Sequence, residues 1–320
     1  MTSRCVKQIK LFALLLCIFI LNSFSVQAEK TPTFPDFEVS LRRYNRSDTI
    51  YADFFENLTQ ERFVKVVKNR QFKKFLAHLY NINKKNSSPG TKHTIPKIIH
   101  QIWLGSPVPE RFKEWMRTWQ GWEGWKYKLW TDADVEAFGL HNQALYDKAA
   151  NYGERSDIFR YEILNREGGL YVDVDFQCFN REFFNYAHGH YDFYTGIEPL
   201  ETTNLSINNA LIASCPDHPL LKAIIHDMQE NYLTAYDPSL GVYTTIATTG
   251  PRYLTKQFKR KELHKGKVDI ALPPTFFYPL IWDDFKLPKT DYAKFLKPES
   301  CAVHWWCGSW LRPEGQVKQK

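Results

Sequence analysis

Apolar and polar residues alternate through GGLYVDVDFQCF, residues 168–179. Side chains of a β-strand point alternately to its two faces, so this pattern predicts a strand with one buried face. The core-facing set is Leu170, Val172, Val174 and Phe176, and the opposite set is Tyr171, Asp173, Asp175 and Gln177. Two carboxylates about 7 Å apart are thus expected on one side of an otherwise apolar strand.

The preceding segment, residues 156–169, has the pattern of an amphipathic helix. Ser156 is expected to cap its N-terminus, and the glycines that begin at Gly168 are expected to end it. Asp157 and Arg160 are three residues apart and share one helical face. On an isolated helix they would form a surface ion pair. Here the helix leads directly into the Asp-x-Asp strand, so its polar face can border the same cleft.

Two further strands are predicted upstream. The apolar run Ile98–Leu104 ends at Gly105 and suits a buried parallel strand. Residues Tyr127–Trp130 form the second strand, after which Thr131 can cap a helix that begins near Asp132. Strands alternating with helices predict an α/β fold with a largely parallel sheet and crossover helices.

Trp103 and Gly105 fall at the carboxyl end of the first of these strands. Ligands of open α/β sheets bind outside the carboxyl ends of the strands, so both residues are expected at the edge of a cleft. Trp103 has two interpretations. It either packs in the core or offers a platform on which a nucleotide base stacks.

Asp173 and Asp175 carry like charges that persist together where a cation or a hydrogen-bond network compensates them. Mg²⁺ or Mn²⁺, held by one or two carboxylates with substrate phosphates completing the shell, fits this pair. A solvated strand end is the alternative, because Asp-x-Asp is common by chance. A metal phosphohydrolase would also use these carboxylates, but it needs further His or Asp ligands near the first pair, and none are evident.

At this point the sequence resembles glycosyltransferase family 32, which has an Asp-x-Asp sugar-binding region. The fungal α-1,6-mannosyltransferases and ceramide-linked mannosyltransferases are members, and the glucosyltransferase domains of large clostridial toxins are distant relatives. Four blocks carry the resemblance in order: IPKIIHQIWLG (95–105), SDIFRYEIL (156–164), GGLYVDVD (168–175) and HWWCGSW (304–310). Two more blocks, NNALIASCPDHPLL (208–221) and TTGPRYLT (248–255), also fit the family pattern. The resemblance covers about two thirds of the chain and implies the GT-A nucleotide-sugar transferase fold, a Rossmann-like unit.

The resemblance also implies roles for individual residues. Asp175 would hold the metal together with Asp173 and, as a hypothesis, His304, whereas Asp173 would also contact ribose or sugar hydroxyls. Asp157 and Arg160 would hold the hydroxyls of the donor sugar, and Trp103 with Gly105 would border the nucleotide. The terminal block would fold over the donor diphosphate, with His304 or Ser309 near the metal and Trp310 in contact with phosphate. Without the family, that block is equally well a hydrophobic strand docked on the core. It also departs from the toxin branch, which has a residue between its Ser and Trp, so the exact metal ligands stay open.

A metal-dependent hexosyltransferase that retains anomeric configuration is therefore the predicted function, with mannose as the favoured sugar and a glycan, glycolipid or protein as acceptor. UDP-dependent transfer of glucose, galactose or N-acetylglucosamine is an alternative, and so is an inactive sugar-nucleotide-binding protein. Retention by double displacement needs a carboxylate behind the anomeric carbon. Asp157 and Glu198 are the available candidates, and a front-face route without a nucleophile is equally open.

Composition agrees with a globular enzyme. The 320 residues are 43% hydrophobic with a mean hydropathy of −0.45, which argues against a polytopic membrane protein. The net charge of +7 is modest, and no nucleic-acid partner is expected. One predicted helix carries a basic run comprising Lys65, Lys68, Arg70, Lys73 and Lys74. Such a run is usually a solvated face, and peripheral contact with a membrane or an acidic acceptor is the minority interpretation.

The N-terminus has the pattern of a secretory signal. Basic residues precede the apolar stretch Leu11–Leu21, and Val26-Gln27-Ala28 offers a cleavage site. We therefore expect a signal peptide, or as second choice a signal anchor, over residues 1–28. A helical stem and linker would follow over 29–94, the GT-A catalytic domain over 95–311 and a tail over 312–320. The expected location is the secretory pathway, either a Golgi-type lumen or outside the cell. A bacterial protein exported into a host cell is the alternative.

Cysteines and glycosylation motifs are consistent with export. Removal of the leader leaves Cys178, Cys215, Cys301 and Cys307, which allow three pairings, with Cys301 and Cys307 nearest in sequence. Four sequons occur, at Asn45, Asn57, Asn86 and Asn204. The His188-Gly-His190 segment is predicted to be a loop.

Overall fold

The computed structural model describes residues 32–41, 70–84, 95–199, 205–241 and 243–311. The predicted leader, the tail 312–320 and all four sequon asparagines lie outside these residues, as do Lys65 and Lys68 of the basic run. Among the described residues, no helix combines the length and the apolar character that crossing a bilayer requires.

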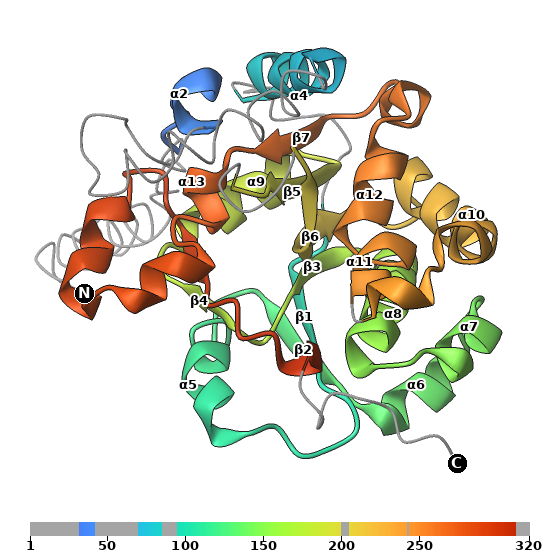
Figure 1. Cartoon of the computed structure of the whole chain (residues 1–320). Coiled ribbons are helices and arrows are strands. Elements are labelled where there is room, and N and C mark those ends of the chain that lie inside the picture. The colour runs from blue at the N-terminus through green and yellow to red at the C-terminus, as the bar shows by residue number, and fades with distance from the viewer. Residues whose placement is uncertain (1–31, 42–69, 85–94, 200–204, 242, 312–320) are drawn as a thin grey trace, which may run out of the picture. The chain divides into compact units, whose positions relative to one another are not determined.

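A six-stranded sheet forms the centre of the fold (Figure 1). Its strands, in spatial order, are β2 (Lys126–Trp130), β1 (Ile98–Ile102), β3 (Gly169–Val172), β6 (Ile207–Ser214), β5 (Phe193–Ile197) and β7 (Asp269–Leu272). Neighbouring strands pair in parallel except at β6, which runs antiparallel to both β3 and β5. The predicted α/β class with a mostly parallel sheet is therefore confirmed.

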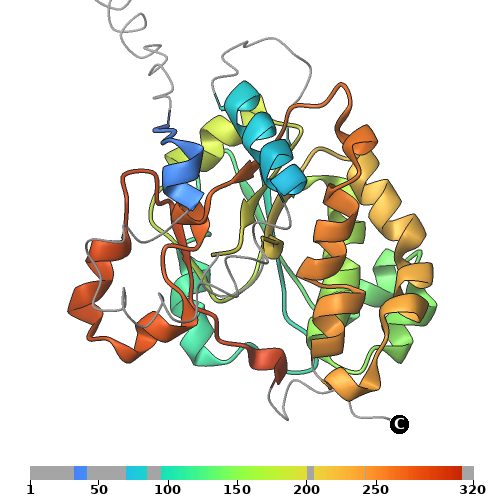
Figure 2. The same ribbon diagram turned by 45° about the horizontal axis from the view of Figure 1, so that its top comes forward.

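Helices cover both faces of this sheet. On one face lie α8 (Tyr152–Glu167), α10 (Pro219–Ala235), α11 (Tyr243–Thr248) and α12 (Pro251–Phe258), and on the other lie α9 (Glu182–His190) and α13 (Pro274–Phe277) (Figures 1 and 2). Shorter helices follow the first two strands: α5 (Glu110–Arg117), α6 (Asp132–Phe138) and α7 (Gln143–Lys148). One large apolar cluster joins the sheet to the helices on both of its faces. The faces of the sheet are therefore covered, and its strand ends lie next to solvent.

The described residues before β1 pack onto the same unit. Helix α4 (Arg70–Asn83) buries Phe72, Leu76 and Tyr80 in the common core and lies against β7. Its last residue, Asn83, donates from Nδ2 to the carbonyl of Asp269 at 2.7 Å. Helix α2 (Phe37–Leu41) contacts α4 and α13. Of the basic run, Lys73 pairs with Glu38 and Lys74 is exposed.

The local sequence patterns predicted β2 and α6 correctly. The Thr131 side chain and Asp134 form a reciprocal capping box at the start of α6, because Asp134 Oδ2 accepts from the Thr131 N–H at 2.8 Å. Strand β1 also forms as predicted, although it ends at Ile102.

Three local predictions were wrong. Helix α8 is capped by Asn151, whose side chain accepts from the Glu154 N–H at 2.9 Å, so Ser156 lies inside the helix. His188 lies in the last turn of α9 and not in a loop. It is buried, with its ring nitrogens 3.1 Å from the Ile95 carbonyl and 3.0 Å from the Tyr194 hydroxyl.

The third error concerns the Asp-x-Asp segment. The predicted continuous strand is broken, because β3 ends at Val172 and β4 (Phe176–Cys178) begins only after Asp175. A turn closed by the Phe176 N–H and the Asp173 carbonyl at 3.1 Å separates the two strands. Strand β4 then pairs with β8 (Ala302–His304) in a separate two-stranded sheet.

No disulfide joins the four cysteines of the described residues. Cys301 is fully buried, and its thiol donates to the Phe276 carbonyl at 3.3 Å. None of the three pairings considered from the sequence is therefore present in this part of the chain.

Candidate active site

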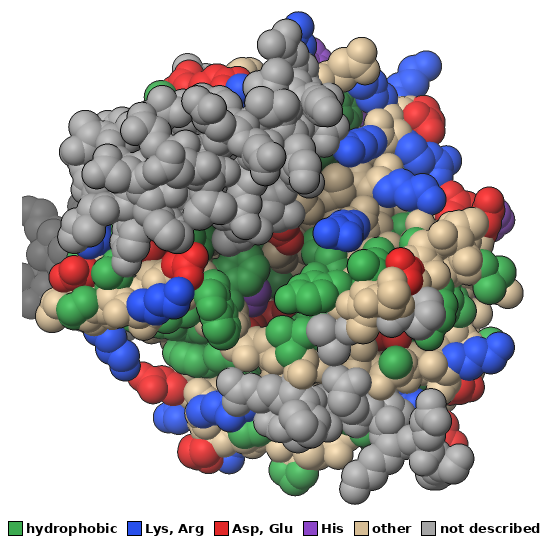
Figure 3. Space-filling model, in the orientation of Figure 1, with side chains coloured by type: hydrophobic (Ala, Val, Ile, Leu, Met, Phe, Trp, Pro, Cys, Tyr) green, Lys and Arg blue, Asp and Glu red, His purple; other side chains and the backbone are tan. Residues whose placement is uncertain are grey.

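The Asp-x-Asp turn lies at the carboxyl end of β3, in the middle of the sheet. Its backbone is fixed from two sides: the Asp173 N–H donates to the Ala210 carbonyl on β6 at 2.8 Å, and Gln101 Nε2 on β1 donates to the Asp173 carbonyl at 3.3 Å. The turn is thus held by both neighbouring strands. Figure 3 shows a hollow in this face of the unit, with acidic and histidine side chains inside it and hydrophobic ones along its sides.

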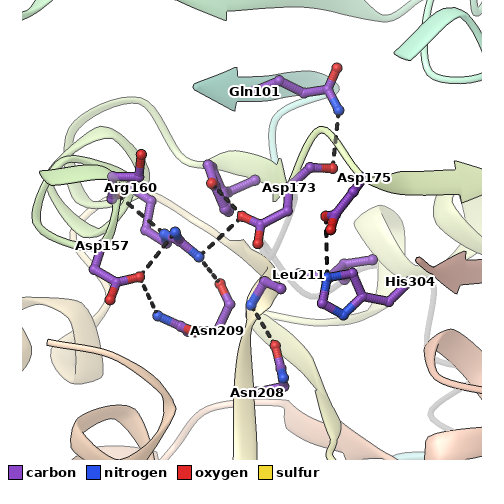
Figure 4. Close-up of polar contacts among 12 residues, drawn as sticks. Gln101, Asp157, Arg160, Asp173, Asp175, Asn208, Asn209, Leu211 and His304 are labelled. Carbon is purple, nitrogen blue, oxygen red and sulfur yellow. Dashed lines mark hydrogen bonds and ion pairs between the residues drawn. The ribbon is translucent and has the colours of Figure 1, made fainter. Parts of the chain in front are cut away.

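Arg160 joins two carboxylates that the sequence predicted to share a cleft (Figure 4). Its NH2 atom lies 2.9 Å from Asp157 Oδ1, and its NH1 atom lies 3.3 Å from Asp173 Oδ1. The guanidinium also donates to the Asn209 carbonyl at 2.7 Å and lies 4.3 Å from the centroid of the Tyr171 ring. The pair is buried, unlike the surface ion pair that these residues would form on an isolated helix, and the Arg160 side chain is 5% exposed.

Both oxygens of the Asp157 carboxylate accept hydrogen bonds from protein side chains. Asn209 Nδ2 donates to Oδ1 at 2.7 Å, and Thr249 Oγ1 donates to Oδ2 at 3.0 Å. Burial raises the pKa of Asp157 to about 6, against the lowering effects of Arg160 and of these two hydrogen bonds. The carboxylate is therefore rigidly oriented yet retains a tendency to take up a proton near neutral pH.

Asp173 differs from Asp157 because it is partly open to solvent. The Tyr171 hydroxyl donates to its Oδ1 at 2.6 Å, as expected for two residues on one face of β3. Burial raises the pKa of Asp173, and the nearby Asp175 carboxylate adds to this, while Arg160 opposes both. Its side chain is 29% exposed, so it can contact a ligand directly.

Asp175 is held by the C-terminal segment. His304 Nε2 lies 3.2 Å from Oδ1, and the backbone N–H of Cys307 donates to Oδ2 at 2.8 Å (Figure 4). Burial on its own would raise the pKa of Asp175, but the His304 ring and the Cys307 N–H together lower it below its ordinary value. Asp175 therefore stays ionised.

Asp173, Asp175 and His304 offer three ligand atoms that lie within 4.8 Å of one another. Two carboxylates suit Mg²⁺ or Mn²⁺, and an imidazole adds a preference for a transition metal such as Mn²⁺. Nδ1 of His304 is buried and has no hydrogen-bond partner among the described residues. The donor set thus fits a divalent cation, and the residues are those that the resemblance indicated.

Trp103 and Gly105 follow the carboxyl end of β1, and Trp103 lies beside the Asp-x-Asp turn. The Trp103 ring is half-buried and packs with Phe112 in a small apolar cluster that includes Val174, the residue between the two aspartates. Gly105 has φ +81°, and a Cβ there would meet the Tyr152 ring at 2.1 Å. Only glycine fits this position. Both interpretations of Trp103 survive, since its ring contacts the core and is partly accessible.

The terminal block begins as a strand docked on the core, which was one of its two interpretations. Residues 302–304 form a strand docked on β4, and the chain then crosses to helix α8, where Trp310 packs against Gly153. A Cβ on Gly153 would lie 2.7 Å from the Trp310 ring. Ser309 begins a short 3₁₀ turn, Ser309–Leu311, and is half-buried. The segment therefore reaches from the Asp175 side of the site to the start of the helix that carries Asp157.

Glu198 follows the end of β5 and is 8% exposed. Its Oε1 accepts from Asn208 Nδ2 at 2.9 Å. Burial raises the pKa of Glu198 to about 7, although Asn208 and His304 both act to lower it. The Glu198 carboxylate is thus close enough to the His304 ring for the two groups to interact electrostatically.

Sequence reasoning gave no role to Asn208, Asn209, Thr249 or Gln101. Two adjacent asparagines inside a strand whose eight residues are all buried are an unusual polar feature that could have marked β6. Thr249 and Gln101 had no comparable signal, because their partners come from distant segments.

Comparisons with known proteins found a matching family model and several relatives. The model of the glycosyltransferase sugar-binding region containing the DXD motif matches residues 109–193. Inositol phosphoceramide mannosyltransferase 1 of Schizosaccharomyces pombe is 29% identical over 195 residues, 58% of this chain and 57% of that protein. Mannosyl phosphorylinositol ceramide synthase SUR1 of Saccharomyces cerevisiae is 27% identical over 231 residues, 66% of this chain and 56% of that protein. The chain thus spans somewhat more than half the length of these relatives.

Among solved structures, the PaToxG glycosyltransferase aligns with a TM-score of 0.40 and 16% identity, over 64% of this chain and 81% of that chain.

The chain is thus similar to glycosyltransferases that have a sugar-binding region with the DXD motif, and its fold is a mixed α/β one with a mostly parallel central sheet. Within this class, the resemblance to family 32 and its fungal mannosyltransferases is confirmed. The matched segment contains Asp157, Arg160, Asp173 and Asp175, whereas Trp103, Glu198 and the terminal block lie outside it.

Proposed function

We propose that the chain transfers a hexose, with mannose favoured, from a nucleoside-diphosphate sugar to an acceptor hydroxyl, with retention of anomeric configuration. One observation carries the proposal. Arg160 links the carboxylates of Asp157 and Asp173, and the pair formed by Asp175 and His304 lies beside them. This arrangement places fixed hydrogen-bonding groups for a sugar next to a donor set for a cation. The names of both yeast relatives favour mannose and a lipid-linked acceptor over a free glycan or protein.

A divalent cation held by Asp173, Asp175 and His304 would neutralise the charge that develops on the leaving diphosphate. The chain's own residues would bind and orient the donor. Asp157 and Arg160 are rigidly placed and would orient the hydroxyls of the donor sugar, while Trp103 would stack on the base. The His304 ring and the Cys307 N–H lower the pKa of Asp175, so this ligand would bind a cation without first losing a proton.

The structure also bears on how retention would arise. Both oxygens of Asp157 already accept hydrogen bonds, and Arg160 pairs with one of them. Nucleophilic attack by Asp157 would break this arrangement. We therefore favour a front-face route, in which the acceptor oxygen bonds to the anomeric carbon as the bond to the diphosphate oxygen breaks, and the acceptor proton leaves with the diphosphate.

Release of nucleotide diphosphate by the full chain, measured for a panel of GDP- and UDP-sugars with Mn²⁺, Mg²⁺ or EDTA, tests the proposal. We expect turnover of GDP-mannose that requires the metal and is lost in Asp175→Asn. The exposed Asp217, whose side chain only pairs with Lys222, offers the matched control Asp217→Asn. Preference for a UDP-sugar would change the donor, and metal-independent turnover would refute the metal site. Metal-dependent binding without turnover would indicate an inactive binding protein.

The expected export signal lies in residues 1–28, and we propose a secretory-pathway location on that basis. Cleavage after Ala28 in secreted material, detected by N-terminal sequencing, is the expected result. An intact N-terminus in a membrane fraction would instead indicate a signal anchor.

A further inference from the structure

Tyr278 is fully buried, yet its hydroxyl has no hydrogen-bond partner among the described residues. Buried polar groups are nearly always satisfied in native proteins, because an unmade hydrogen bond costs stability. A buried hydroxyl left without a partner next to a candidate active site therefore indicates a group that a ligand would satisfy.

The Tyr278 ring packs against the paired strands β4 and β8, the second of which carries His304. Its centroid is 5.6 Å from that of Phe176 on β4 and 5.9 Å from that of His304 on β8. On the other side it packs on Gly196 of β5, where a Cβ would lie 2.4 Å from the ring. The pairing of β5 with β6 is irregular between Thr195 and Ile197, and such irregularities re-aim the side chains that follow. Glu198 is the next residue after this strand.

The charges around the Tyr278 hydroxyl are those of the site. Burial raises the pKa of Tyr278 well above its ordinary value, and the carboxylates of Glu198, Asp173 and Asp175 raise it further, against Arg160. A phenol carries its proton at neutral pH, so the Tyr278 hydroxyl can donate a hydrogen bond.

Glu198 supplies the complementary group. Its Oε1 accepts one hydrogen bond from Asn208, and a carboxylate has about four lone-pair positions in all. Glu198 is 8% exposed, so its carboxylate is largely buried but not completely closed off from solvent.

We propose that Tyr278 and Glu198 bind and orient the acceptor hydroxyl that receives the sugar. This inference rests on the proposed transferase function. A hydroxyl group has one proton to donate and two lone pairs with which to accept, so it can donate to Glu198, accept from Tyr278 and keep one lone pair for attack. As the new bond forms, Glu198 would take this proton and pass it to the departing diphosphate. Asp157, Arg160 and Asp173 are already committed to the donor side, which leaves this pair for the acceptor.

Tyr278→Phe removes only the hydroxyl and keeps the packed ring. Tyr191→Phe is the matched control, because Tyr191 is also fully buried with a hydroxyl that lacks a partner, but its ring lies against Tyr186 and Tyr194 on the α9 side of the core. Glu198→Gln tests the second member and keeps the shape of the side chain. The probes are GDP-mannose with Mn²⁺ as donor and inositol phosphoceramide in detergent micelles as the lipid-linked acceptor that the names of the relatives favour.

We expect Tyr278→Phe and Glu198→Gln to raise KM for the acceptor probe about tenfold, as loss of one hydrogen bond predicts. Their affinity for GDP-mannose should stay within about twofold of wild type, and Tyr191→Phe should match wild type throughout. The melting temperature of Tyr278→Phe should not fall, since the hydroxyl has no partner to lose.

Three results would overturn the assignment. A melting temperature of Tyr278→Phe several degrees below wild type would mean that the hydroxyl has a structural partner, whatever the activity. Weaker donor binding with unchanged acceptor KM would move the pair to the donor side. Wild-type kinetics in both variants would exclude the pair, whereas a wild-type protein that turns over no donor would refute the proposed function itself.

Discussion

Arg160 NH2 lies 2.9 Å from Asp157 Oδ1 inside the protein, although the two residues are one helical turn apart on α8 and could have paired at the surface. Burial raises the free-energy cost of breaking this ion pair. An exposed ion pair contributes little to stability, whereas a buried one is costly to break because the remaining charge is left uncompensated. Here a second carboxylate, that of Asp173, depends on the same guanidinium.

Arg160→Met should therefore lower the free energy of unfolding by about 3–5 kcal/mol. Arg260→Met is the matched control, because Arg260 pairs with Asp227 but its side chain is 40% exposed. We expect that change to cost less than about 1 kcal/mol. Urea unfolding of both variants at pH 7 measures the difference. Similar losses in the two variants would show that the Arg160 charge is solvated in solution.

The polar partners of Asp157 show which part of the site could be predicted from the sequence alone. Asp157, Arg160 and Asp173 could be predicted because they lie on one helix and the adjoining strand, and the pattern of that segment placed them on facing surfaces. Asn209 and Thr249 bond to Asp157 from β6 and from the turn before α12. Nothing local to those segments specifies the partner, so only the tertiary fold brings them together.

The errors have a similar cause. Ser156 is a good helix cap, but Asn151 is another, and only packing decides where α8 begins. The alternating pattern at Asp173–Asp175 favoured a continuous strand, but β4 leaves β3 to pair with β8, which lies at the far end of the chain. A single-sequence pattern cannot reveal that competing strand.

Trp103→Ala should weaken the binding of GDP with Mn²⁺ about tenfold or more, since stacking on a base contributes about 1–3 kcal/mol. Trp103 is partly accessible beside the Asp-x-Asp turn, and this accessibility is what a stacking platform needs. Trp282→Ala is the control, because Trp282 is 61% exposed and lies outside the site residues described above. Isothermal titration calorimetry reports both affinities. Equal affinity in Trp103→Ala and wild type would assign Trp103 to the core alone.

Asp157 should make stability depend on pH in the direction opposite to that of an ordinary ion-paired carboxylate. Its pKa is raised from 3.8 to about 6 in the folded state, so the folded protein holds this proton at pH values where the unfolded chain has released it. The resulting stabilisation is complete below about pH 4 and is lost as the pH rises through 6. The loss attributable to this group is up to about 3 kcal/mol, at roughly 1.4 kcal/mol per pKa unit.

Asp157→Asn isolates that contribution, because the variant cannot titrate. The free energy of unfolding of wild type minus that of Asp157→Asn should decrease between pH 4.5 and pH 7. Guanidinium unfolding at several pH values measures it, with the exposed Asp217→Asn as a variant that should show no such trend. A difference that grows with pH would mean that Arg160 outweighs burial and that the pKa of Asp157 is lowered.

Gly153→Ala tests whether the terminal segment matters to the donor site. A Cβ on Gly153 would lie 2.7 Å from the Trp310 ring, closer than real Cβ contacts allow, so the ring must move away from α8. Because the same segment supplies the Cys307 N–H to Asp175, its displacement should weaken metal-dependent binding of GDP-mannose several-fold. Gly189→Ala provides the control, since that glycine is also helical and an added Cβ meets nothing within 4 Å. Alanine improves intrinsic helix propensity at both positions, so a general loss of stability is not expected. Unaltered donor affinity in Gly153→Ala, measured beside Gly189→Ala, would separate Trp310 from donor binding and leave it a role in packing only.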